Sequence, residues 1–118
     1  MPKVFLKKTE IKVSVRREVD SPETKLSSEM RRNLFLCAKE SLNNIYKHSK
    51  ANEVYITFNL NVDEVFTMQI VDNGVGFYNN QNSGYGLQNM QKRMNDVGGK
   101  YEICNSEKGV CLYFVVKI

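Results

Sequence analysis

Two short stretches decide how this chain folds: residues 40–48, which read ESLNNIYKH, and residues 72–77, which read DNGVGF. Side chains three and four residues apart stack on one side of an α-helix, so one uninterrupted helix would present a single polar stripe. The second stretch directly follows the apolar, β-branched run 65–71 and is typical of a turn after a strand. The stripe consists of Glu40, Asn44, Lys47 and His48.

The neighbouring apolar residues place this stripe at the edge of the core, because they recur at helical spacing and lie mostly to one side of it. They are Leu34, Cys37, Ala38, Ser41 and Ile45. Mg²⁺ prefers a few protein oxygens together with water and phosphate, so Asn44 is the candidate metal ligand. Glu40, one turn earlier, is the candidate general base or water-orienting group. The alternative is an ordinary solvated helix face.

The turn after the strand adds a carboxylate and flexible backbone. Gly74 and Gly76 let the main chain approach a ligand closely. The Asp72 carboxylate can accept a hydrogen bond from the exocyclic amine of adenine, whereas guanine presents a carbonyl oxygen there, so Asp72 would select ATP over GTP. The alternative is a hairpin turn without a ligand.

A third stretch, residues 84–87 (GYGL), opens a second helical pattern. Its apolar side consists of Leu87, Met90, Met94 and Val97, and Gly98 and Gly99 follow as a natural stop. A glycine loop that leads into a helix offers free backbone N–H groups and the positive end of the helix dipole, which together hold phosphate. The alternative is a plain core helix, in which the methionines only pack.

Taken in this order, the three stretches resemble the nucleotide-binding boxes of the GHKL superfamily, and the Lys-His ending at residues 47–48 most resembles the sensor histidine kinases that pair with helix-turn-helix response regulators. The resemblance covers about residues 27–118. It implies that the ATP-binding residues are Asn44, Lys47, His48, Asp72, Gly74, Gly76, Phe77, Gly84, Tyr85, Gly86 and Leu87.

The resemblance also implies a function. The chain would be a catalytic domain that transfers the γ-phosphate of Mg-ATP to a histidine on a separate dimerisation domain, with a response regulator downstream. The alternatives are an anti-sigma-factor serine kinase of the same superfamily and a degenerate nucleotide-binding scaffold. The family's Gly-Thr pair, whose threonine supports the adenine-binding aspartate, aligns from Ser106 with Cys111 and Leu112. Leucine cannot donate that hydrogen bond, so either nucleotide binding is weaker or a water or another side chain takes the place of the threonine.

The expected fold is α+β: a two-layer sandwich in which a mixed, mainly antiparallel sheet packs on helices. We expect one domain over residues 1–118, with a first strand region and linker in 1–26 and the phosphoacceptor segment outside the chain, as in an excised fragment. The strands are expected at 4–19, 54–60, 65–71, 101–105 and 110–118, and the helices at 27–49 and from 87 to the glycines at 98–99.

Composition fits a single globular domain, with 42% hydrophobic and 25% charged residues. The formal charge of +4 suits a polyanionic ligand, but no motif for direct nucleic-acid binding accompanies it. No membrane span or signal pattern is present, so we expect the cytoplasm, as the cytoplasmic end of a membrane-anchored sensor. Three cysteines without metal-ligand spacing, Cys37, Cys104 and Cys111, are expected to be reduced and buried.

Overall fold

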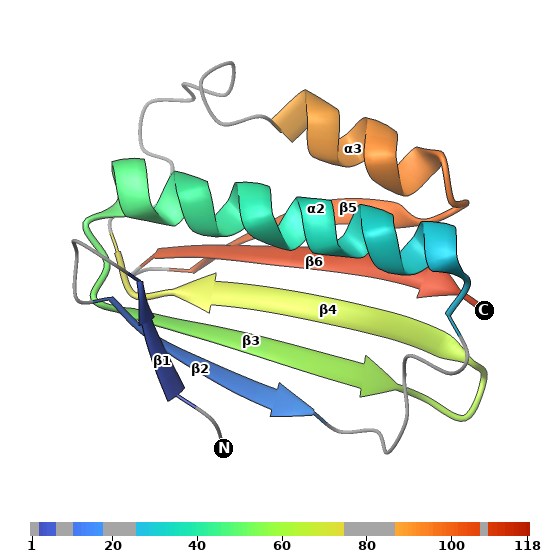
Figure 1. Ribbon diagram of the computed structural model, residues 1–118, viewed down its shortest axis with the longest axis horizontal. Helices are drawn as coiled ribbons and strands as arrows, with labels where there is room; N and C mark the ends of the chain where they lie inside the picture. Colours follow the sequence, from blue (N-terminus) through green and yellow to red (C-terminus); the bar gives the residue numbers. More distant parts are fainter. Residues whose placement is uncertain (1–2, 7–10, 18–25, 75–86, 107–108) are drawn as a thin grey trace.

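The computed structural model describes residues 3–6, 11–17, 26–74, 87–106 and 109–118, with the backbone alone for 3–6, 48–49, 87 and 105–106. Within these residues, six strands form one sheet in the order β1-β2-β3-β4-β6-β5, and helices α2 and α3 lie over one face of it (Figure 1). The elements are β1 (Lys3–Leu6), β2 (Ile11–Arg17), α2 (Ser28–Asn44), the π-helical turn η1 (Ile45–Ser49), β3 (Glu53–Leu60), β4 (Val65–Asp72), α3 (Leu87–Asn95), β5 (Lys100–Ser106) and β6 (Gly109–Lys117).

The sheet is mixed, because β2 and β3 run parallel while every other neighbouring pair is antiparallel. The two helices form the second layer, so the expected α+β sandwich is confirmed. Strand β4 shows why the sheet packs on one face: Phe66, Met68 and Ile70 are buried and the residues between them are partly exposed. This alternation is the signature of a strand with one covered face.

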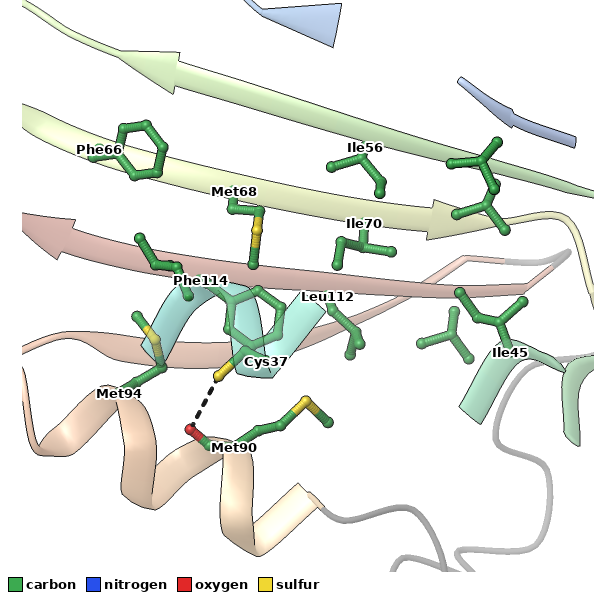
Figure 2. Close-up of a cluster of buried hydrophobic side chains, with 14 of the residues drawn as sticks. Cys37, Ile45, Ile56, Phe66, Met68, Ile70, Met90, Met94, Leu112 and Phe114 are labelled. Atoms are coloured by element: carbon green, nitrogen blue, oxygen red, sulfur yellow. Dashed lines mark hydrogen bonds between the residues drawn. The ribbon is translucent and has the colours of Figure 1, made fainter. Parts of the chain in front are cut away.

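The core lies between the sheet and the two helices. Figure 2 shows Phe114 and Leu112 of β6 among side chains from α2 and α3. The Cys37 thiol donates to the Met90 carbonyl at 3.8 Å, and the Ser41 hydroxyl contacts the Met90 sulfur at 3.4 Å. Burial raises the pKa of the Cys37 thiol to about 11, so this cysteine is an inert part of the core.

Helix α2 begins as the sequence predicts and ends differently. The Ser27 hydroxyl caps it by accepting from the Met30 N–H at 3.1 Å. The α-helix ends at Asn44, five residues earlier than expected, and the chain continues as the π-helical turn Ile45–Ser49. Lys50, with a φ of 58°, terminates this turn in the left-handed region. Because a π-helical turn holds more residues than an α-helical one, the α-spacing that placed Lys47 and His48 in the polar stripe does not apply there.

The expectation of three reduced cysteines is wrong for two of them. Cys104 on β5 and Cys111 on β6 lie opposite each other in the antiparallel register and form a disulfide, with their Cα atoms 4.8 Å apart. This separation is within the range that a disulfide requires. The two residues are equally distant from the centre of the expected turn at 106–109, which was the signal in the sequence. Cys37 is the free, buried thiol.

Candidate functional site

Asp72, the last residue of β4, carries a carboxylate that is buried in the fold. It pairs with Val54 of β3 and is only 3% exposed. Its Oδ1 accepts from the Gly74 N–H at 2.7 Å, whereas Oδ2 is buried and has no hydrogen-bond partner among the described residues. Burial raises the pKa of Asp72, and the N–H groups of Gly74 and Val110 oppose this by stabilising the carboxylate. An orphaned, buried carboxylate oxygen is costly unless a ligand donates to it.

The turn after Asp72 is held by Asn73, which the sequence analysis did not single out. Its Oδ1 accepts from the backbone N–H groups of Asn52 at 3.0 Å and Glu53 at 3.1 Å. Its Nδ2 donates to Asn52 Oδ1 at 2.7 Å. These bonds tie the end of β4 to the beginning of β3, so the chain leaves the sheet after Asp72 in a fixed direction. Asparagine immediately after a strand is a recognisable turn signal, which could have found it.

The beginning of β6 packs directly on Asp72. A Cβ atom placed on Gly109 would lie 2.8 Å from Asp72 Oδ1 and closer still to the Asp72 carbonyl oxygen, so only glycine fits there. The next residue, Val110, acts on the carboxylate through its N–H and is itself buried. Leu112, by contrast, pairs with Ile70 in the core.

This contact corrects the expected alignment of the glycine-threonine pair. The residues beside the aspartate are Gly109 and Val110, and not Cys111 and Leu112. The glycine is therefore present, and valine stands where the family has threonine. Valine supplies a backbone N–H but no hydroxyl. Cys111 and Leu112 lie two residues further along β6, so neither stands in the place of the family's glycine or threonine.

Helices α2 and α3 run antiparallel and are joined through backbone carbonyls of α3. Asn33 Nδ2 donates to the Arg93 carbonyl at 2.8 Å, and Cys37 bonds Met90 one turn later. Because residues three and four apart share a helix side, Glu40 and Asn44 continue this α3-facing edge of α2 toward the beginning of α3. Asn44 is buried at 8% exposure, and Glu40 is half-buried.

The described elements therefore converge at one end of the molecule. Figure 1 shows that the C-terminal end of α2, the end of β4 and the beginning of β6 lie at the same end. Of the expected site residues, Glu40 and Asn44 belong to α2, Asp72 is the last residue of β4, and Gly74 follows it by two residues. Lys47 is exposed on η1, His48 is placed there by its backbone alone, and Leu87 is the first residue of α3. Gly76, Phe77, Gly84, Tyr85 and Gly86 lie outside the described residues.

The described residues contain no group of three or more His, Cys, Asp or Glu side chains that would hold a metal ion. In the described part of the chain, neither α2 nor α3 combines the length and the apolar character needed to cross a bilayer.

Known proteins resemble this chain in sequence and in fold. Over 92 residues, 76% of this chain, it is 33% identical to the sensor histidine kinase LiaS of Bacillus subtilis. The chain belongs to the sensor histidine kinase family. Its match covers 25% of LiaS, so it spans about a quarter of that relative's length. No protein-family model matches the chain.

Solved structures place this histidine kinase domain within the known fold. The blue-light activated histidine kinase of Erythrobacter litoralis superposes with a TM-score of 0.76 at 16% identity, over 91% of this chain and 35% of that one. The ATP-binding domain of PrrB from Mycobacterium tuberculosis gives a TM-score of 0.66 at 19% identity, over 88% and 77% of the two chains. At these identities the likeness concerns the fold, which is that of the histidine kinase ATP-binding domain.

Proposed function

We propose that this chain is the catalytic ATP-binding domain of a sensor histidine kinase, which transfers the γ-phosphate of Mg-ATP to a histidine on a separate dimerisation domain. The observation that carries the proposal is Asp72 Oδ2, a buried acceptor without a partner among the described residues. The exocyclic amine of adenine is a donor that satisfies it, whereas the carbonyl oxygen of guanine would repel it. The Asp72 carboxylate would therefore select adenine.

The remaining described groups suit the phosphates. The beginning of α3 carries the positive end of a helix dipole, which favours phosphate, and the α3-facing edge of α2 brings Asn44 toward it. The Asn44 amide oxygen would hold Mg²⁺, which supplies neutralisation of charge on the β- and γ-phosphates when it is bound. Lys47 and His48, one turn further along, would lie near the phosphates. Gly76, Phe77, Gly84, Tyr85 and Gly86 would complete the nucleotide-binding set.

Glu40 lies one turn before Asn44 on the same edge of the helix. A carboxylate there is placed to orient the acceptor or to take its proton during transfer. The acceptor histidine must approach the γ-phosphate in line with the leaving oxygen. His48 is the chain's one histidine and lies on η1, beside the proposed metal ligand, so it is badly placed to be the acceptor. Downstream, we propose that the phosphoryl group passes to a response regulator.

The test is phosphoryl transfer from γ-labelled ATP to a dimeric helical fragment of the parent protein that carries the acceptor histidine. We expect acid-labile label on that fragment alone. Asn44→Ala should remove the Mg²⁺ dependence of nucleotide binding, and Glu40→Gln should preserve binding but slow transfer. Asn43→Ala, an exposed neighbour of the same chemistry, is the matched control and should behave as wild type. Label on His48, or full transfer by Glu40→Gln, would contradict the assigned roles.

A further inference from the structure

The Cys104–Cys111 disulfide lies near the end of β4, because Cys111 pairs with Val71, the residue before Asp72. Along β6, Leu112, Phe114 and Val116 point into the core, so Cys111 points to the face that the helices leave uncovered. We propose that this disulfide is a reversible redox site that sets the affinity of the chain for nucleotide at Asp72, an inference that rests on the proposed function of that residue.

The two sulfur atoms differ in access. Cys104 belongs to β5, the edge strand of the sheet, and is half-buried, whereas Cys111 belongs to β6 in the interior of the sheet and is 7% exposed. Gln69 on the neighbouring strand donates from Nε2 to Cys111 Sγ at 3.3 Å. An attacking thiolate therefore reaches Cys104 first, and the departing Cys111 sulfur has a hydrogen-bond donor ready to stabilise its negative charge.

The exchange balances with a dithiol reductant. One thiolate of the reductant attacks Cys104 Sγ, a mixed disulfide forms, and Cys111 leaves as a thiolate. The second thiolate of the reductant then attacks the reductant sulfur of that mixed disulfide and releases Cys104. The reductant ends as a disulfide, two electrons pass to the protein, and the two cysteines take up protons. Exchange with an external disulfide runs the same steps in reverse.

The disulfide is coupled to Asp72 through the beginning of β6. Beyond the Cys104–Cys111 rung, only the pairs Asn105–Val110 and Ser106–Gly109 hold this end of the hairpin together in the described register. Gly109 is the residue that packs against Asp72, and the Val110 N–H acts on its carboxylate. Cleaving the crosslink frees the end of the hairpin that contacts Asp72, so the reduced form binds nucleotide more weakly.

The experiment measures ATP affinity by calorimetry for the oxidised chain and for the chain reduced with dithiothreitol. Alkylation of free thiols followed by mass spectrometry establishes each redox state. We expect reduction to raise the Kd of the wild type by about fivefold or more, within ordinary coupling between sites. Cys104→Ser should bind like the reduced wild type in both conditions. Cys37→Ser, which alters the inert core thiol, should keep the redox response.

A second readout separates this inference from the proposed function. Amide hydrogen exchange of residues 109–112 and 69–74 should accelerate on reduction in the wild type and not in Cys104→Ser. If ATP binds to neither redox form, the proposed function fails, and the exchange data still decide whether the disulfide controls the Asp72 site. Equal affinity in the two redox states, unchanged exchange, or a chain in which Cys104 and Cys111 do not oxidise would overturn the inference.

Discussion

Gly109→Ala tests whether the contact of β6 with Asp72 supports nucleotide binding. The added methyl group would lie 2.8 Å from Asp72 Oδ1 and closer to the Asp72 carbonyl oxygen, which is backbone and cannot rotate away. The end of β6 must therefore shift. Overpacking of this kind costs about 1–3 kcal/mol of unfolding free energy, which leaves an ordinary domain folded. The shift also misplaces the Val110 N–H, and a hydrogen bond to a charged group contributes roughly 1.5–3 kcal/mol.

We therefore expect the ATP Kd of Gly109→Ala to rise by about 10- to 100-fold, measured by calorimetry on folded protein. Gly99→Ala is a matched control, because its methyl group would lie 2.6 Å from the Val115 carbonyl oxygen, away from Asp72. Urea denaturation should show a comparable loss of stability in both variants, and only Gly109→Ala should lose affinity. Wild-type affinity in a folded Gly109→Ala, or equal losses of affinity in the two variants, would refute the reasoning.

Two further predictions concern the same carboxylate. Burial raises the pKa of Asp72, so ATP affinity should fall as the pH is lowered through that raised pKa, at which an ordinary aspartate is still ionised. Without nucleotide, the protonated carboxyl group stabilises the folded chain, and this stabilising effect is lost as the pH rises through the raised pKa. ATP affinity measured across this pH range for the wild type and for Asp72→Asn separates the contribution of Asp72 from protonation of the nucleotide. Parallel pH profiles of the two proteins would count against a contribution of Asp72. Val110→Thr adds a hydroxyl beside Asp72 with little change in side-chain volume. Calorimetry should show tighter ATP binding by about 0.5–1.5 kcal/mol. An unchanged affinity would mean that the hydroxyl does not reach the carboxylate.

Local patterns predicted most of the fold. Strand β4 alternates along its whole length, Ser27 is a capping residue before an apolar helical pattern, and Gly98 stops α3 with a φ of 72°. Each of these features depends on residues close together in the chain, which is why the sequence is informative there.

The features that the sequence did not predict depend on contacts between distant segments. An α-helix and a π-helical turn differ only in hydrogen-bond register, so propensity could not place the change after Asn44. The family's glycine-threonine pair was matched two residues too far along β6, because only the register against β4 shows that Gly109 contacts Asp72. The Cys104–Cys111 pairing likewise follows from the register of β5 with β6.

The sequence predicted only part of the candidate site, because the rest also depends on contacts between distant segments. Asp72 follows directly from a strand that ends in an acid, and the structure adds what the sequence could not contain: the burial of this carboxylate and an oxygen without a partner among the described residues. Three residues of the site carried little functional signal in their residue types alone. Asn73 holds the turn through bonds to the main chain of β3, Gly109 allows a close approach to Asp72, and Val110 acts through its backbone N–H.

The most direct test of the account compares ATP with inosine triphosphate, in which a carbonyl oxygen replaces the adenine amine. If Asp72 Oδ2 accepts from that amine, the chain must bind ATP much more tightly than inosine triphosphate in calorimetric titrations with Mg²⁺. Asp72→Asn, whose amide can present a donor, should lose most of its ATP affinity and most of this discrimination, with an unchanged circular-dichroism spectrum. Equal affinities of the wild type for the two nucleotides would contradict the assignment of Asp72 to the adenine pocket.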